Sequence, residues 1–457
     1  MATTRAPRTI DLAALINGRQ LNGYNYLLIA LSWLITMFDG LDMMMVSFTA
    51  PYMRDELGLT THQLGNVFAA GTAGMVVGGL SFTYIGDRIG RRPTIIISAF
   101  SFAILTMATA LATNYEQLVA LRFFDGLAIG GMLPLAWALN IEFVPNKIRA
   151  TIVAIIMMGF SLGSAGAAPL TNLIAPTYGW EGVYFFGGAG TLLVAAALAI
   201  WLPESPRFLV SKGLKPEVVV KTFRRLDPSV DMEPTDNFIL GDEGKHKANF
   251  KVSDLFAGRL KLITPMIWLG YGASALGIFF GSNWGPSVLE ALEIPRQTAA
   301  MISSVGGLLG ACTGIAIMKL AERFGLIVIA TIPLIVVPIL LTLGFGLAPP
   351  ALFVPLIVMQ AMLVGGGHSA IISQLALYYP SAIRASGGGW AGSVGKIGGV
   401  MGPLLGAAVL SSGIPVVRTY AVMAACPAIL FFCILGVVLV VRKPEEEEIH
   451  GQVATAH

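Results

Sequence analysis

Long apolar runs separated by short polar segments make up most of this chain. Twelve of the runs are long enough to span a membrane as a helix, which requires about 20 mostly apolar residues. The runs lie at residues 26–50, 63–85, 93–112, 116–141, 150–174, 181–202, 262–284, 297–318, 326–346, 351–374, 386–411 and 417–441. The pattern predicts an all-α membrane protein with twelve transmembrane helices.

The single long polar stretch divides these helices into two sets of six. We expect a cytoplasmic N-terminal segment (1–25), a six-helix bundle (26–202), a cytoplasmic central loop (203–261), a second six-helix bundle (262–441) and a cytoplasmic tail (442–457). Composition supports this organisation, because 55% of the residues are hydrophobic, only 12% are charged and the mean hydropathy is +0.75. A soluble protein of this length would need more charge to cover its surface.

The distribution of Lys and Arg predicts the orientation, since cytoplasmic loops of membrane proteins are enriched in these residues. With the N-terminus inside, 24 of the 29 Lys and Arg residues fall in cytoplasmic segments. The first 25 residues lack the pattern of a cleaved signal peptide. We therefore expect a multi-pass protein of the cell inner membrane with both termini in the cytoplasm.

The two halves of the sequence repeat each other at one constant offset. Residues 86–90 (GDRIG) align with 321–325 (AERFG), and residues 145–150 share Pro, Ile, Arg and Ala with 380–385. Six-helix halves that repeat are a plan of secondary transporters, with the substrate site between them. We predict a cytoplasmic gate from charges in or near these loops: Asp87, Arg88, Arg91, Arg92, Glu142, Arg149, Glu322, Arg323 and Arg384. Part of this pattern also follows from topology alone.

Four charged residues inside the apolar runs stand out, because a charge in the membrane is costly and usually marks function. Asp39 and Asp42 are one helical turn apart and share a helix face. Two close carboxylates favour binding of a proton, so we predict a proton-coupling site. Arg122 could pair with Asp42 or with a bound anion, and Lys396 adds a positive charge from the other half. An anionic substrate is favoured, with structural salt bridges as the alternative.

Other polar and aromatic residues are weaker candidates for substrate binding: Asn283, Trp284, His368 and Trp390. The alternatives are an interface anchor for Trp284 and packing roles for His368 and Trp390. His368 could also carry protons. Glu142 fits gate pairing better than proton binding.

Several classes of function are disfavoured by what the sequence lacks. It has no nucleotide-binding loop, no nucleophile elbow and no cluster of metal ligands, and its three cysteines all lie in apolar runs. We therefore expect neither an enzyme nor a cofactor or metal site. Most basic residues lie in the loops between the apolar runs, so nucleic acid is not an expected partner.

The run GDRIGRR at 86–92, together with twelve helices and a central loop, resembles the major facilitator superfamily. The usual motif begins with Gly where this chain has Thr83. Within the superfamily, the DGLD run at 39–42, Arg122 with Asp125 and the YP–RASG pattern at 379–387 resemble the aromatic acid:proton symporter family. That family often has Arg where Lys396 stands, and Lys cannot make the same two-point contact with a carboxylate.

The resemblance implies a monomeric symporter that imports a benzoate-like or hydroxybenzoate-like carboxylate with protons, by way of Asp39 and Asp42. Besides this small aromatic carboxylate, its partners would be protons and the lipid bilayer. One alternative is a transporter of another solute, such as a sugar, an aliphatic carboxylate or a drug. The second alternative is a receptor or a membrane enzyme, and the repeated halves of the sequence argue against both.

Overall fold

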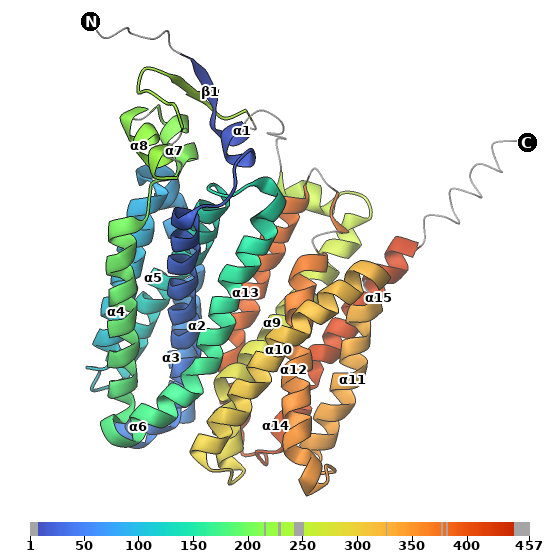
Figure 1. The fold of residues 1–457 in the computed structure, drawn as a ribbon. Coiled ribbons are helices and arrows are strands. Elements are labelled where there is room, and N and C mark those ends of the chain that lie inside the picture. Colours follow the sequence, from blue (N-terminus) through green and yellow to red (C-terminus); the bar gives the residue numbers. More distant parts are fainter. Residues whose placement is uncertain are drawn as a thin grey trace, which may run out of the picture. The chain divides into compact units, whose positions relative to one another are not determined.

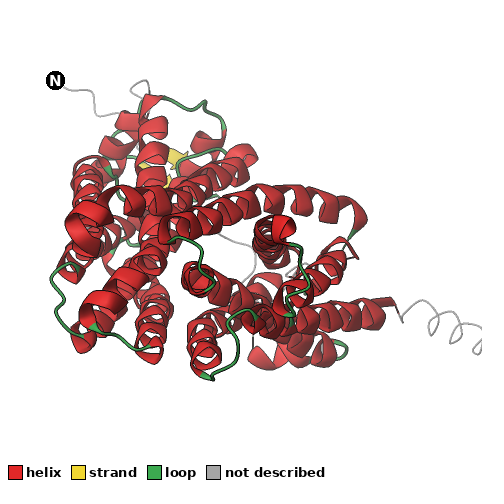
Figure 2. Ribbon diagram, turned by 90° about the horizontal axis from the view of Figure 1, so that it is seen from below, coloured by secondary structure: helices red, strands yellow, loops and turns green. Residues whose placement is uncertain are grey.

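The computed structural model describes residues 8–213, 216–226, 230–241, 251–325, 327–375, 378–380 and 383–442. Nearly all of this part of the chain is helical, and two short strands are the exception (Figures 1 and 2). Of the predicted cytoplasmic tail at 442–457, only Arg442 lies within the described residues.

The first half of the chain forms five long helices: α2 (Gly23–Leu57), α3 (Thr61–Ile89), α4 (Arg91–Thr109), α5 (Tyr115–Ile141) and α6 (Arg149–Trp201). Two of the predicted helices are joined in α6. Gly179 has non-helical backbone angles (φ 69°, ψ −178°), so the chain turns sharply there between the two helical parts of α6 (Figure 1). Glycine tolerates this left-handed φ without the steric penalty of a Cβ.

The second half forms the long helices α9 (Leu260–Ala291), α10 (Arg296–Phe324), α11 (Ile327–Gly344), α12 (Pro350–Leu375), α13 (Arg384–Ser411) and α15 (Ala425–Arg442), with the short α14 (Arg418–Met423) before α15. The last predicted helix is therefore divided into α14 and α15. Among the described residues, eleven segments are long and apolar enough to cross a membrane, one of which is the joined pair. The predicted all-α architecture is confirmed.

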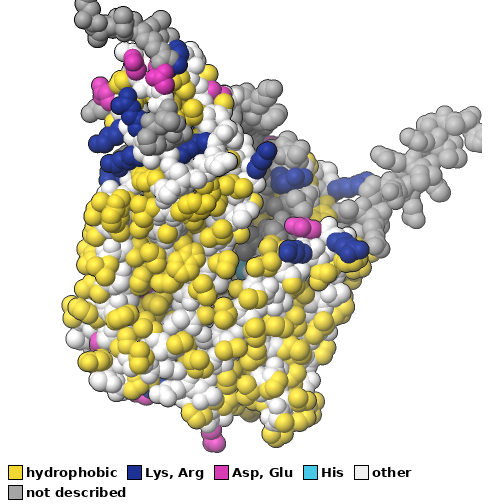
Figure 3. Space-filling view, in the orientation of Figure 1, with side chains coloured by type: hydrophobic (Ala, Val, Ile, Leu, Met, Phe, Trp, Pro, Cys, Tyr) yellow, Lys and Arg dark blue, Asp and Glu magenta, His cyan; other side chains and the backbone are white. Residues whose placement is uncertain are grey.

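Side-chain chemistry follows the same plan. Hydrophobic side chains cover the helical part of the face in Figure 3, whereas Lys and Arg gather toward the predicted cytoplasmic end of the helices. Lipid-facing helices need this exposed apolar surface, because an unpaired charge in the hydrocarbon region is unfavourable. The protein is a multi-pass membrane protein.

Contacts divide the chain into two units, and the division does not fall in the central loop alone. Unit 1 holds the described residues of 1–45 and 73–246, and unit 2 holds those of 46–72 and 247–457. The segment Val46–Thr72, here called the outer hairpin, joins the ends of α2 and α3. It comes from the first half of the sequence but packs within unit 2.

The predicted repeat recurs in the loop geometry of the two halves. The Arg149 Nε donates to the Val144 carbonyl at 3.4 Å, and at the corresponding place in the second half the Arg384 Nε donates to the Tyr379 carbonyl at 3.3 Å. In both loops this arginine begins a long helix. Each arginine therefore fastens its helix start to the preceding loop in the same way.

The close approach of helices is repeated as well. A Cβ on Gly163 of α6 would collide with the Met37 carbonyl of α2, and a Cβ on Gly398 of α13 would collide with the Gly272 carbonyl of α9. Both members of the first pair are related to those of the second by the offset that relates Arg149 to Arg384. Small residues at these positions allow the backbones to touch.

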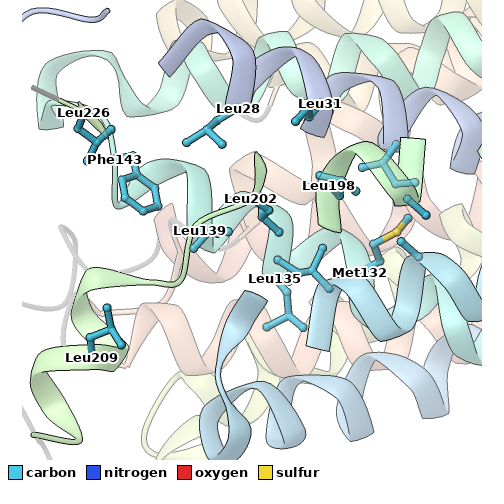
Figure 4. Packing of buried hydrophobic residues seen from close by; sticks show 14 of the residues in the cluster. Leu28, Leu31, Met132, Leu135, Leu139, Phe143, Leu198, Leu202, Leu209 and Leu226 are labelled. Atoms are coloured by element: carbon cyan, nitrogen blue, oxygen red, sulfur yellow. The ribbon is translucent and has the colours of Figure 1, made fainter. Parts of the chain in front are cut away.

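The core of unit 1 extends from the helices into the predicted cytoplasmic region. Buried aliphatic residues of α2, α5 and α6 continue into α7 (Pro206–Ser211) and α8 (Pro216–Leu226), and the labelled residues in Figure 4 follow this path from Met132 to Leu226. The same cluster includes Leu12 and Ile16 of α1 (Leu12–Asn17). The apolar face of α8 is thus covered by the chain itself.

A small parallel sheet holds the N-terminal segment against the central loop. Strand β1 (Thr9–Asp11) pairs with β2 (Asn237–Ile239) in the register Thr9↔Asn237. The Asp11 Oδ1 accepts bonds from the backbone N–H of Ala13 at 2.9 Å and of Gly241 at 3.0 Å. One carboxylate therefore caps α1 and fastens it to the central loop.

We expect Asp11→Ala to loosen this attachment. The N–H of Gly241 lowers the pKa of Asp11 from its usual 3.8. Because the folded-state pKa is depressed, the contribution is present above pH 3.8 and is lost as the pH falls through the folded value. Removing an N-cap carboxylate costs about 1 kcal/mol, so amide exchange at residues 237–241 should be about fivefold faster at pH 7. Asp254→Ala removes a similar cap elsewhere, and an equal change at 237–241 in that control would contradict the assignment.

The outer hairpin is bound to unit 2 by charges and by aromatic packing. The Arg296 Nη2 contacts Asp55 Oδ2 and Glu290 Oε1, each at 2.7 Å, and the guanidinium lies 4.5 Å from the ring centre of Tyr52. Further along, Phe68 packs edge-on against Trp284 with ring centres 5.2 Å apart. These contacts explain why Val46–Thr72 belongs to unit 2.

Candidate functional site

An ionic cluster lies in the apolar interior of unit 1. The Arg122 guanidinium of α5 donates from Nη1 to Asp42 Oδ1 at 3.1 Å and from Nη2 to Asp42 Oδ2 at 2.9 Å. Nη1 also donates to Asp125 Oδ2 at 3.0 Å. All three residues are at most 3% exposed. The two-point contact with Asp42 is the strongest arrangement of a guanidinium and a carboxylate.

Close packing of neighbouring helices positions the side chains of this cluster. On α3, Gly74 and Gly78 lie against the backbone of α5 at Phe123 and Leu127, so α3 and α5 touch on either side of Asp125. On the other side, Gly163 of α6 lets α2 approach closely. These contacts restrict the rotation of α2 and α5 and direct Asp42 and Arg122 toward each other.

Asp39 is the unusual member of the cluster. It is fully buried, and neither carboxylate oxygen receives a hydrogen bond from any described residue. Asp42, one turn away, has a guanidinium partner. An ionised carboxylate without a hydrogen-bond donor is strongly disfavoured in a buried position, so Asp39 differs from Asp42 in its surroundings.

Charge counting indicates what the cluster can do. Two carboxylates, Asp42 and Asp125, contact the guanidinium of Arg122, and the Tyr184 ring lies 5.9 Å from the Arg122 Cζ. The buried carboxyl group of Asp39 lies one turn from Asp42 on α2. Such an excess of buried carboxylates favours proton uptake. The Arg122–Asp42 pair predicted as one alternative for the empty site is present. Its functional role stays a prediction.

Lys396, the second predicted cation, lies on α13 in unit 2. Its side chain is exposed, and no hydrogen bond or ion pair ties it to another described residue. The neighbouring Gly395 lies against the Tyr271 ring, which leaves no room for a Cβ there. This packing fixes the register of α13 on α9, and the Lys396 side chain stays exposed.

The weaker candidates of unit 2 are largely engaged with the protein. The Asn283 Nδ2 donates to Phe279 O at 2.8 Å, and the Trp284 Nε1 donates to Pro403 O at 2.9 Å. Trp390 stacks on Trp268 with ring centres 6.0 Å apart. The stacking agrees with the packing alternative noted for Trp390. Trp284 is 2% exposed and hydrogen-bonded inside unit 2, which does not match the interface anchor noted as its alternative. A role of either residue in binding stays a prediction.

His368 lies beside an apolar cavity inside unit 2. The cavity is small, with a volume of about 30 Å³, and is bordered by residues of α9, α11, α12, α14 and α15. The His368 Nδ1 lies 3.0 Å from the Ser274 Oγ, and the imidazole stacks on Tyr271 at 5.4 Å. By the offset of the repeat, Ser274 corresponds to Asp39, so unit 2 carries a neutral hydroxyl at the place of the carboxylate.

The predicted gate residues of unit 1 form a network on the predicted cytoplasmic side. Glu142 pairs with Arg91 and accepts a hydrogen bond from Ser205. Glu204 accepts bonds from the backbone N–H groups of Arg91 and Arg92 at 3.0 and 3.1 Å and so caps the start of α4. The network ties α4 and α5 to the segment after α6 within one unit.

The remaining gate candidates are more exposed. Asp87, Glu322 and Arg323 lie at the surface, Arg88 is 4.3 Å above the Tyr84 ring, and the Arg92 side chain donates to carbonyls at the end of α6. Arg149 and Arg384 bind the loop carbonyls described above. A gating role for these residues remains a prediction.

Sequence reasoning missed several residues of these networks. Thr106 of α4 donates to Asp125 Oδ1 at 3.2 Å, and Ser205 and Glu204 complete the network around Glu142. Hydroxyl groups in apolar helices carry no periodic signal, so Thr106 could not be singled out. Glu204 lies just before the start of α7, and this position was the available clue.

Comparisons with known proteins agree with this architecture. The Major Facilitator Superfamily model matches residues 32–357. The chain is 30% identical over 407 residues to the 4-hydroxybenzoate transporter PcaK of Pseudomonas putida, covering 89% of this chain and 91% of that protein. It is also 30% identical to the gallate transporter of Pseudomonas putida, covering 89% and 90%.

A solved structure gives the same fold. A bacterial homologue of the human lysosomal transporter Spinster, in an inward-facing and occupied conformation, superposes with a TM-score of 0.71 at 17% identity and covers 93% of this chain and 99% of that one. The resemblance noted in the sequence is thereby confirmed. The protein belongs to the Major Facilitator Superfamily, whose members are transporters and not enzymes.

Proposed function

We propose that this protein is a secondary transporter that imports an aromatic carboxylate together with protons, by alternating access. The proposal is supported by relatives named for 4-hydroxybenzoate and gallate and by the buried cluster around Arg122. One observation carries it: Arg122 already holds a carboxylate, that of Asp42, by two parallel hydrogen bonds. A substrate carboxylate would fit the same guanidinium in the same way.

Exchange of carboxylates would couple substrate to protons. While Asp42 is ionised, it occupies the Nη1 and Nη2 donors of Arg122. A proton on Asp42 removes its charge and weakens its hold, so that a substrate carboxylate can replace it. Asp39, buried beside Asp42 without a donor among the described residues, is the proposed acceptor through which the proton passes.

Lys396 is the proposed substrate contact of unit 2. An exposed ammonium without a partner in the described part of the chain is suited to a single-point contact with a carboxylate. Asn283, Trp284, His368 and Trp390 remain further candidates. The charged residues of the cytoplasmic network are proposed to act as the gate, in a monomer of the inner membrane with both termini in the cytoplasm.

Transport in proteoliposomes tests the proposal. An inward proton gradient should drive accumulation of radiolabelled 4-hydroxybenzoate, and an uncoupler should abolish it. Benzoate and gallate should compete, whereas a neutral sugar should not. Equal uptake with and without the gradient would remove proton coupling, and uptake of the sugar alone would favour the alternative of another solute.

Lys396→Ala should weaken carboxylate binding by about tenfold or more, because a hydrogen bond to a charged group contributes roughly 1.5–3 kcal/mol. Affinity for the neutral amide of the same acid should not change. Lys319→Ala, at another exposed helix position of unit 2, is the matched control. Unchanged carboxylate affinity in the Lys396 variant would reject its role.

A further inference from the structure

Asp125 stands out because it contacts the guanidinium from the same helix. It lies one turn after Arg122 on α5, and its Oδ2 accepts from Arg122 Nη1 at 3.0 Å. Its Oδ1 accepts from the Thr106 Oγ1 of α4 at 3.2 Å. The carboxylate is fully buried and is held from both sides. Asp42 reaches the same guanidinium from a different helix, α2.

This difference divides the cluster into a fixed and an exchangeable part. Arg122 and Asp125 are joined through one turn of α5, so a displacement of α2 would not separate them. Helix α4 is fastened to α5 by the Ser98 hydroxyl, which donates to the Ala128 carbonyl, and by Thr106. The contact of Asp42 with Arg122, in contrast, depends on where α2 lies relative to α4 and α5.

We propose that Asp125 is a positioning residue that keeps the Arg122 guanidinium in place and electrically balanced while Asp42 gives way to the substrate carboxylate. This inference rests on the proposed function. A buried guanidinium that lost its only counter-charge would be strongly disfavoured, so release of Asp42 requires a second carboxylate that stays. Thr106 would hold Asp125 in the rotamer that reaches Arg122.

The pH dependence of binding should report this role. In the described structure, the charged and titratable groups facing Arg122 are Asp42 from α2, Asp125 from α5 and Tyr184 from α6, whereas α4 contributes the neutral Thr106. Asp39 lies one turn before Asp42 on α2. Without the Asp125 charge, Asp42 would be the remaining ionic partner and would be held more firmly as an anion. Replacing it with substrate would then require a higher proton concentration.

The test is binding of 4-hydroxybenzoate to purified protein between pH 5 and 8, followed by initial rates in proteoliposomes. In Asp125→Asn, half-maximal binding should move by about one unit to lower pH, and KM at pH 7 should rise about tenfold. The maximal rate at low pH should stay within about threefold of the original. Asp125→Glu should restore much of the original pH profile.

Two threonines of α4 provide a matched pair if Asp125→Asn fails to fold. Thr106→Val removes the bond to Asp125, whereas Thr109→Val removes a buried hydroxyl that donates only to its own helix at Leu105. A shift of the pH profile in the first variant alone supports the proposal. An unchanged profile in Asp125→Asn, or equal effects of both threonine variants, overturns it. Failure of the unaltered protein to bind aromatic carboxylates would instead reject the proposed function.

Discussion

Arg122→Ala is expected to abolish 4-hydroxybenzoate accumulation and to destabilise the protein strongly. The substitution leaves Asp42 and Asp125 buried without their guanidinium. Removing one partner of a buried ion pair costs about 3–5 kcal/mol, because the remaining charge is uncompensated. The loss should be visible as a lower temperature at which the detergent-solubilised protein loses its monodisperse form.

Two further variants separate stability from transport. Arg122→Lys keeps the charge but cannot make two parallel bonds to one carboxylate, so it should fold and bind substrate weakly. The double variant Arg122→Gln with Asp42→Asn removes both charges and should recover part of the stability but none of the transport. Normal accumulation by Arg122→Ala would refute the role assigned to this residue.

Asp39→Asn, unlike Arg122→Ala, is expected to have little effect on stability but a large effect on proton coupling. An amide has nearly the shape of a protonated carboxyl group, and Asp39 has no hydrogen bond to lose among the described residues. The variant should lose gradient-driven accumulation, with an internal to external substrate ratio near one. Exchange of labelled for unlabelled substrate at equal pH should continue.

A matched control for this variant lies in the same helix. Ser47 is also fully buried in α2 and its hydroxyl has no hydrogen-bond partner in the described structure, but it carries no ionisable group. Ser47→Ala should therefore accumulate substrate normally. If Asp39→Asn concentrates 4-hydroxybenzoate as well as the unaltered protein does, proton coupling does not pass through Asp39.

Much of the fold could be predicted because membrane helices are recognisable in the sequence as long apolar runs. Each long helix is an apolar run, and the repeated loops containing Arg149 and Arg384 are recognisable from Pro and Arg at a fixed offset. The pairing of Arg122 with Asp42 could be anticipated for a related reason, since buried charges require partners.

The parts that could not be predicted depend on tertiary packing. Whether the predicted helix at 150–174 ends before the next begins depends on a local turn at Gly179. The hydroxyl of Thr106 and the capping carboxylate of Glu204 acquire their partners only when distant helices meet. The open position of Lys396 likewise follows from how α13 packs on α9.

The outer hairpin has a consequence for biosynthesis. Asp55 is made 241 residues before Arg296, its partner within unit 2. At a synthesis rate of about 5–20 residues per second, this delay is roughly 12–50 s. During that interval α2 and α3 are already complete, yet Asp55, Tyr52 and Phe68 lack the surface they will pack against. The nascent first half must therefore remain intact with an unpacked outer hairpin until α9 and α10 have been synthesised.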